Sequence, residues 1–282
     1  MHFGNELHKY SELYDLSLEK LDTSKDRVLN KLPTSFNSDL DFDTDHHFTV
    51  LDTETTGLED DDEVIALHYL MVKFSDDFEQ FKVFADYTMY REPSKEISEE
   101  ITKLTGITYE DVRGKEIPNC LIEEIFDVDF VVAHNAEFDK KKIEYTFPNT
   151  KLNVPWGCTS KDIDWKSKGC ATTSLASLVA QYLKCYMTHH DPKQDSWASF
   201  WLAFLNFKEL TEAIYKDTYR VYAHKSPFDN KDNLKSAGFK WSSEDRVWFI
   251  DVLSDDLEKF EEIVKENLGE PESILIQPEL RI

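Results

Sequence analysis

Two carboxylates, Asp52 and Glu54, stand one residue apart at the end of an apolar segment, and Gly57 follows them. Residues 48–53 are mostly aromatic, aliphatic or β-branched, which predicts a buried strand. Side chains alternate along a strand, so both carboxylates leave it on the same face. Two like charges about 4 Å apart repel by about 4 kcal/mol at an effective dielectric of about 20, and the pair therefore predicts a divalent cation. The alternative is that both acids begin a solvated loop, because residues 59–63 are all acidic.

Two further segments carry polar residues that could join this pair. Residues 130–133 form a second apolar segment, followed by Asn135 and Asp139. In the third segment, His190 precedes Asp195 by five positions, and a helical pattern opens at Asp195. Together the three segments supply four carboxylates and an imidazole. Such a set can hold divalent cations and can accept a proton near neutral pH.

The three segments resemble the three exonuclease motifs of the DEDDh (DnaQ-like) 3′ to 5′ exonuclease family, in the RNase H-like superfamily. The likeness rests on five residues in the family's order and spacing, which are Asp52, Glu54, Asp139, His190 and Asp195. It implies that all five are catalytic, and that the four acids hold two Mg²⁺ ions, for which Mn²⁺ can substitute.

The resemblance also implies how these residues divide the work. Asp52 is expected to bridge both ions, Glu54 and Asp195 to complete the site of the ion that binds the attacking water, and Asp139 to hold the second ion. His190 is expected to be the general base. Spacing selects it over His189, because the residue five positions after His189 is Gln194.

The third segment departs from the family pattern. Residues 192–194 are Pro, Lys and Gln, where the family generally has small or apolar residues. The proline could reposition His190. The resemblance therefore predicts the reaction class better than it predicts the rate of the reaction or the pH dependence of that rate. We further expect Thr55, Asn135, Phe138 and Lys240 to contact the substrate, and His134 to be structural.

Composition limits the class of protein. A chain of 282 residues, 40% of them hydrophobic, can form one domain of ordinary size with a small appendage. The formal net charge of −24 has the wrong sign for a protein that holds a polyanion, so we expect nucleic acid to be bound through metal ions and a local basic patch. The four cysteines show no metal-ligand spacing, and no apolar run approaches the length of about 20 residues that spans a bilayer. These features, and a charged amino terminus, predict a cytoplasmic protein without a membrane segment.

The order of predicted elements gives the fold class. Residues 1–45 are expected to be a helical extension, with amphipathic helices over 5–32, and a polar linker over 33–47. Residues 46–214 then alternate three strands, the last two a hairpin over 64–74 and 80–87, with helix, strand, helix, short strand and helices. This order predicts an α/β, RNase H-like mixed β-sheet flanked by helices.

A change of composition near Tyr215 predicts a second unit. Residues 215–268 are expected to be a small α+β module of strand, helix, hairpin and helix, and residues 269–282 a mobile tail. Lysines interleave there with Trp241 and Trp248, which suits phosphate contacts and base stacking. The alternative, which we prefer for both tryptophans, is that they form the core of a module too small to spare them.

These observations together predict a metal-dependent 3′ to 5′ exonuclease that releases nucleoside 5′-monophosphates from DNA or RNA. Its partners are expected to be single-stranded nucleic acid 3′ ends, and its state a monomer or homodimer. The alternative is a non-catalytic interaction protein that uses an exonuclease-like domain as a docking surface.

Overall fold

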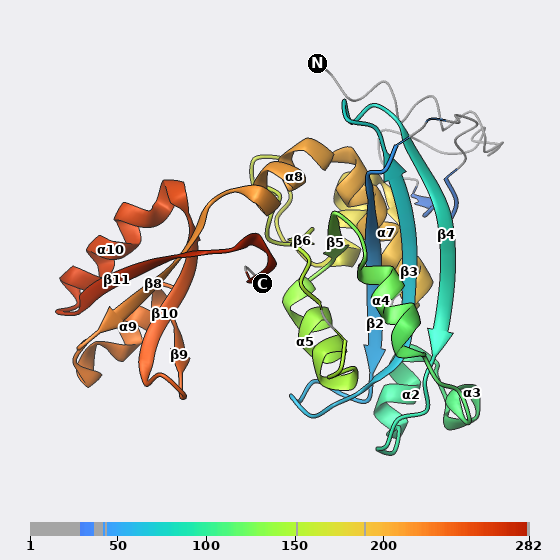
Figure 1. Cartoon of the computed structure of the whole chain (residues 1–282), viewed down its shortest axis with the longest axis horizontal. Coiled ribbons are helices and arrows are strands. Elements are labelled where there is room, and N and C mark those ends of the chain that lie inside the picture. Colours follow the sequence, from blue (N-terminus) through green and yellow to red (C-terminus); the bar gives the residue numbers. More distant parts are fainter. Residues whose placement is uncertain (1–28, 37–41, 43, 151, 189, 281–282) are drawn as a thin grey trace.

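The computed structural model describes residues 29–36, 42, 44–150, 152–188 and 190–280. They form a larger α/β domain and a smaller module beside it (Figure 1). The helices expected over residues 5–32 lie almost wholly outside the described residues. The few described residues at the end of that range include a strand instead, β1 (Asn30–Lys31), which pairs in parallel with β7 (Cys185–Tyr186).

The larger domain is built on a five-stranded mixed sheet with the order β4-β3-β2-β5-β6. The first three strands in the chain are antiparallel, and the last two run parallel to β2. The predicted α/β mixed sheet is thus confirmed, including the hairpin. The strands are β2 (His47–Thr55), β3 (Val64–Phe74), β4 (Phe81–Tyr90), β5 (Phe130–Ala133) and β6 (Trp156–Cys158).

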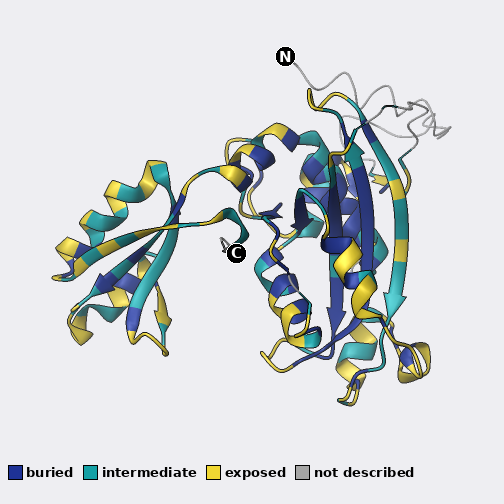
Figure 2. Ribbon diagram, in the orientation of Figure 1, coloured by how far each residue is buried: buried dark blue, intermediate teal, exposed yellow. Residues whose placement is uncertain are grey.

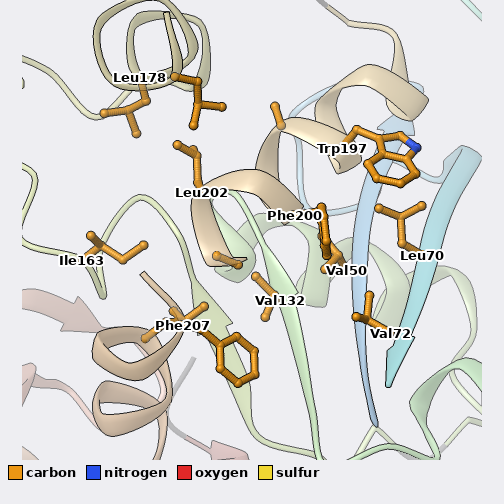
Figure 3. Close-up of a cluster of buried hydrophobic side chains, with 14 of the residues drawn as sticks. Val50, Leu70, Val72, Val132, Ile163, Leu178, Trp197, Phe200, Leu202 and Phe207 are labelled. Atoms are coloured by element: carbon orange, nitrogen blue, oxygen red, sulfur yellow. The ribbon is translucent and has the colours of Figure 1, made fainter. Parts of the chain in front are cut away.

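Helices cover both faces of this sheet, so β2 and β3 are almost fully buried (Figure 2). On one face, Phe48 and Val50 of β2 pack with Trp197 and Phe200 of α7 (Pro192–Leu205) and with α8 (Phe207–Tyr215) (Figure 3). On the other face, Leu51 of β2 packs with α4 (Asn119–Phe126) and α5 (Ala136–Thr146). Alternate residues of β2 therefore contribute side chains to two separate hydrophobic cores, one on each face of the sheet.

The remaining helices of this domain follow local sequence signals. α2 (Glu99–Thr105) begins at Ser98, whose hydroxyl accepts a hydrogen bond from the Ile101 N–H, and ends at Gly106 with φ of 74°. A short α3 (Tyr109–Val112) follows it. The helix expected over 173–183 is divided into α6 (Leu175–Leu178) and a π-helical turn, η2 (Val179–Leu183).

The described part of the expected linker packs against the domain. Leu32 is buried, the Trp201 indole N–H donates to the carbonyl of Pro33, and Phe36 lies against Phe200 and Phe204 with ring centroids 5.4 and 5.3 Å away. The polar composition of residues 33–47 hid the apolar anchor Phe36, whereas Leu32 belonged to the range expected to be helical. This segment is consequently part of the core on the α7 side.

The module is a four-stranded antiparallel sheet with the order β11-β8-β10-β9. Its elements are β8 (Thr218–His224), η3 (Phe228–Asn230), α9 (Lys231–Ser236), β9 (Lys240–Ser242), β10 (Val247–Leu253), η4 (Ser254–Asp256), α10 (Leu257–Glu266), β11 (Glu270–Ile276) and η5 (Pro278–Leu280).

The prediction of a tail from residue 269 was wrong, because β11 pairs with β8 along its whole length. Its acidic, proline-containing sequence has a tail-like composition. An unpaired edge of β8 nevertheless offers backbone donors and acceptors to any strand that can reach it, largely regardless of side chains. The carboxyl-terminal segment supplies that strand.

Among the residues that the structure describes, the module's own helices cover one face of its sheet. Val221, Ala223 and Val252 pack there with residues of α9 and α10. The other face carries Arg220 and Phe249 and is turned toward α5 (Figure 1). Trp248 packs at the helix-covered side as expected, but Trp241 is 51% exposed, so the core interpretation was wrong for that ring.

Across the part of the chain that the structure describes, no helix combines the length and the apolar character that a bilayer span requires.

Candidate active site

The strand β2 presents its two acids as the sequence predicted. Asp52 and Glu54 lie on the same face as Phe48 and Val50, which is the α7 face, and the side chain of Glu54 is buried. The acidic segment after β2 is also ordered, because Asp62 is buried and accepts hydrogen bonds from Thr56 Oγ1 and Glu59 N. The two acids therefore belong to the strand and not to a solvated loop.

Asp139 reaches β2 from the opposite side of the sheet. β5 pairs with β2 only over residues 48–50, so the edge of β2 beyond that point is open on this side. Asp139 uses that edge, since its Oδ1 accepts hydrogen bonds from the Thr53 N–H at 3.1 Å and the Thr53 hydroxyl at 2.8 Å. Asn135, in the left-handed conformation with φ of 71°, turns the chain from β5 into α5 and so places Asp139.

α7 supplies Asp195. The helix starts at Pro192, three residues earlier than expected, because Asp191 caps it by accepting hydrogen bonds from the N–H groups of Lys193 and Gln194. His190 directly precedes the cap, with a left-handed φ of 56°. Its ring nitrogen and carboxylate oxygens of Glu54 and Asp195 lie within 4.8 Å of one another.

The residues that depart from the family pattern hold this region in place. Lys193 Nζ contacts Asp86 Oδ2 of β4 at 3.0 Å, and Asp86 Oδ1 lies 2.9 Å from Nε2 of the buried His68. Gln194 accepts a hydrogen bond from the Thr188 N–H and donates one to Asp191. The ion pair thus attaches the first turn of α7 to the sheet. The hydrogen bonds of Gln194 hold the loop that carries His190 on either side of that residue, at Thr188 and at Asp191.

Burial and mutual repulsion make this cluster unfavourable without a cation. Burial, followed by the charges of Asp195 and Asp139, raises the pKa of Glu54 to about 8. Burial also raises the pKa of Asp139 and of Asp195 to about 7, although hydrogen bonds from Thr53 and from the His190 backbone oppose the two shifts. The pKa of Asp52 is raised well above its ordinary range by burial and then by Asp195, Asp139 and Glu54.

The donor set fits divalent cations. Four acids converge from β2, α5 and α7, and the charges of Glu54, Asp139 and Asp195 each raise the pKa of at least one other acid of the cluster. The buried Oδ1 of Asp195 has no hydrogen-bond partner among the described residues, which is costly for a carboxylate oxygen unless a cation meets it. Hard oxygen donors of this kind suit Mg²⁺ and Mn²⁺.

The other expected substrate contacts are spread out. Thr55 is buried at the end of β2 and donates its hydroxyl to the Gly57 carbonyl at 2.6 Å, while Asn135 is exposed at the start of α5. Phe138 is partly buried, with Lys142 Nζ 5.3 Å from its ring centroid. Lys240 is not part of the carboxylate cluster; it lies in the module and contacts Glu137 of α5.

His134 has two ring contacts that fit a structural role. One nitrogen lies 2.8 Å from Thr159 Oγ1 and the other 2.9 Å from the Thr173 carbonyl. Burial lowers the pKa of His134 to about 4, so the ring is neutral and bridges two segments.

Sequence reasoning assigned no role to three residues that shape the site. Thr53 positions Asp139, Lys193 fastens α7, and Asp191 is a fifth carboxylate whose charge also raises the pKa of Glu54 and of Asp195. A Pro directly after an Asp was the available signal for the helix start. The contact between Lys193 and Asp86 spans 107 positions of the chain and left no local signal.

A family model described as exonuclease (RNase_T) matches residues 49–200, which is more than half of the chain. Among curated proteins, the chain is 30% identical over 187 residues to the PolC-type DNA polymerase III of Thermotoga maritima, and 29% identical over 113 residues to the 3′-5′ exonuclease DinG of Bacillus subtilis. These matches cover 60% and 38% of the chain, and it spans only 12% of the length of either relative.

Among solved structures, Escherichia coli Exonuclease I in complex with a dT13 oligonucleotide superposes with a TM-score of 0.53 and 14% identity. The match covers 79% of this chain and 70% of the other. At this identity the likeness concerns the fold alone.

Proposed function

The chain belongs to the exonuclease family, with the RNase H-like fold and DEDDh motif order, and on that premise we propose that it is a metal-dependent 3′ to 5′ exonuclease. It hydrolyses phosphodiester bonds of DNA or RNA from single-stranded 3′ ends and releases nucleoside 5′-monophosphates. One observation supports this most strongly: acids from three distant segments meet beside an imidazole.

The four acids are the residues that would hold the cations. On the family resemblance, Asp52 would contact both ions, Glu54 and Asp195 would hold one of them, and Asp139 would hold the other. Bound divalent cations supply neutralisation of the phosphoryl oxygens and make water a nucleophile at neutral pH. The contribution of the protein is to fix the four carboxylates, and Thr53 does so for Asp139 through two hydrogen bonds.

His190 is the proposed general base. It accepts the proton of the attacking water at a ring nitrogen, and that ring lies close to Glu54 and Asp195. The fastening of α7 through Lys193 and of the preceding loop through Gln194 supports this assignment, because a base must be held within hydrogen-bonding reach of the water.

The docking-protein alternative has no comparable support. A docking surface gains nothing from burying carboxylates whose pKa values are raised to about 7 and 8, and their repulsion destabilises the fold.

A degradation assay tests the proposal. The full chain would be incubated with matched single-stranded DNA and RNA oligonucleotides labelled at the 5′ end, in Mg²⁺, in Mn²⁺ and in EDTA, with the Asp52→Asn variant as the control. We expect a ladder of products that shorten from the 3′ end and keep the label, with no products in EDTA or from the variant. Intact oligonucleotides in both metals would reject the enzyme and favour the docking alternative, and immediate release of a labelled mononucleotide would contradict the direction.

A further inference from the structure

A cleft of about 800 Å³ separates α5 from the helix-free face of the module's sheet. α5 contributes Glu137 and Lys141 to its walls, the segment after β6 contributes Lys161, and the module contributes Lys240 and Trp241. Figure 1 shows the module lying on the side of α5 that is turned away from β2. The cleft is therefore a second site on the same helix that carries Asp139.

The charge of the cleft differs from that of the chain. The chain has 56 acidic and 32 basic residues, whereas five basic and four acidic residues line the cleft. A polyanion is repelled by most of this protein, and the repulsion is cancelled locally here. The cleft is therefore a region where nucleic acid can approach a protein whose net charge is −24.

Three lysines converge on one carboxylate within the cleft. The Nζ atoms of Lys141, Lys161 and Lys240 lie 3.0, 3.0 and 2.9 Å from oxygens of Glu137. Three ammonium groups around one carboxylate form an anion site that the protein fills with its own side chain.

A phosphodiester can take the place of that carboxylate. Both groups carry one negative charge and present two acceptor oxygens to N–H donors. Each lysine side chain in the cluster is more than half exposed, so a ligand can approach all three.

An aromatic ring stands beside the anion site. Phe249 lines the cleft and is the partner of Lys240 in the strand register, so both side chains lie on the cleft face of the sheet, with the Arg220 guanidinium 4.6 Å from the Phe249 ring centroid. Aromatic rings interleaved with lysines are the pattern by which proteins bind single strands, because any unpaired base can stack on them. A duplex, whose bases are already stacked, gains no such contact.

The two sites on α5 face in different directions. Glu137 and Asp139 are two residues apart, and successive helical residues are turned by about 100°, so their side chains leave on nearly opposite sides of the helix. A strand whose 3′ end lies at the carboxylates can thus continue past α5 into the cleft.

We propose that the cleft binds the single-stranded segment on the 5′ side of the nucleotide being removed. A backbone phosphate replaces Glu137 among Lys141, Lys161 and Lys240, and a base stacks on Phe249. The assignment of the segment's direction rests on the proposed exonuclease function, whereas binding in the cleft does not.

Binding to the full chain in EDTA tests this inference, because no cleavage occurs there. The probe is a fluorescent single-stranded oligonucleotide of about 20 nucleotides, followed by anisotropy over a series of salt concentrations. We expect the triple Lys141→Gln, Lys161→Gln, Lys240→Gln variant to weaken binding about tenfold and to reduce the salt slope by about 0.7, the share of one phosphate contact. Lys225→Gln, which removes a paired lysine of the module outside the cleft, is the matched control and should bind like the unaltered protein.

Two further variants separate binding from a merely structural role of the cleft. Glu137→Gln removes the competing anion, so it should tighten binding about threefold to tenfold, opposite in sign to Lys240→Gln. Phe249→Leu should weaken binding at least about fivefold with an unchanged salt slope, while Phe228→Leu, at an exposed ring outside the cleft, should not.

Two results would overturn the inference. One is a triple lysine variant that binds like Lys225→Gln. The other is a Glu137→Gln variant that loses affinity as Lys240→Gln does, which would show that the ion pair only joins the two parts of the protein. Hydrolysis of the p-nitrophenyl ester of thymidine 5′-monophosphate by the unaltered protein in Mn²⁺ tests the chemistry separately. No hydrolysis with lysine-dependent binding would count against the proposed function, and hydrolysis with lysine-independent binding against the cleft.

Discussion

Glu137 and Asp139 lie two residues apart on α5 and meet opposite surroundings. Asp139 faces three other acids in a buried cluster, and burial raises its pKa to about 7. Glu137 faces three lysines in the cleft, and its pKa is held far below the usual range. One side of the helix is therefore short of positive charge and the other side has it in excess. The difference teaches that one helix can present an acidic cluster on one side and a lysine cluster on the other, separated by its own width.

The largest effect is expected when the carboxylates of Asp139 and Glu137 are each replaced by the corresponding amide. Asp139→Asn should lower kcat for oligonucleotide cleavage by at least about a thousandfold, because a carboxylate that holds a cation is lost. Glu137→Gln should instead keep kcat and lower KM, because it frees lysines for the substrate. Steady-state kinetics in Mg²⁺ measure both. Similar losses of kcat in the two variants would erase the distinction between the two sides of α5.

A second prediction concerns His190, the proposed general base beside the acidic cluster. His190→Ala should lower kcat by about a hundredfold or more, the usual share of a general base, while Mn²⁺ binding measured by calorimetry persists. His189→Ala is the neighbouring control and should be nearly silent; the structure of His189 lies outside the described residues. Equal losses in the two variants would contradict the choice of base.

Thr53 tests how far positioning matters. Thr53→Val keeps the β-branched shape but removes the hydroxyl that donates to Asp139 at 2.8 Å, whereas the backbone N–H remains. We expect affinity for Mn²⁺ to fall about tenfold, at the low end for the loss of a residue that orients a metal ligand. Thr53→Ser should restore it. If the serine variant were as weak as the valine variant, packing and not the hydrogen bond would be responsible.

The smallest effect concerns stability in the absence of metal. The pKa values of Asp139 and Asp195, about 7, and of Glu54, about 8, exceed the value of about 4 that such groups have in an unfolded chain. The folded state thus binds more protons between about pH 4 and pH 8, and the free energy of unfolding falls as pH rises through this window. Glu137, with its lowered pKa, contributes with the opposite sign, since its contribution is present above about pH 4 and is lost as pH falls.

Thermal melts in EDTA measure this effect. We expect Tm to be several degrees lower at about pH 8 than at about pH 5, and Mg²⁺ to restore it at the higher pH. The Asp52→Asn variant should show a smaller decline, because one of the repelling charges is gone. A melting temperature that rises over this range in EDTA would contradict the raised pKa values.

Local patterns predicted most of the fold and placed the acids on the right elements. Alternation along β2 gave the common face of Asp52 and Glu54, and Ser98 and Gly106 marked the ends of α2. The sequence failed where partners distant in the chain decide the structure. β11 exists because β8 offers an open edge, and Trp241 is exposed because β9 lies at the border of the module's sheet. Neither fact leaves a trace in local composition.

The same reason explains what was missed at the site. From the sequence alone, Pro192 and Lys193 were interpreted as a departure from the third motif, because the residues next to them in the sequence do not indicate a structural role. In the structure the proline starts α7 and the lysine meets Asp86 of β4. The residue types of the carboxylate cluster were therefore predictable, whereas the residues that hold it in place were not.

The attachment of the module has a mechanical consequence. Thr218 lies beside both Ile276 and Leu253, so the module joins the larger domain at one end of its sheet, where Lys140 Nζ also binds the Glu279 carbonyl. Lys240 lies beside Phe249 and thus four residues farther along, about 13 Å from that pivot. At the other end of the sheet, the module contacts α5 through the ion pair between Lys240 and Glu137. Because salt screens exposed ion pairs, we expect higher ionic strength to weaken the attachment of this end of the sheet to α5.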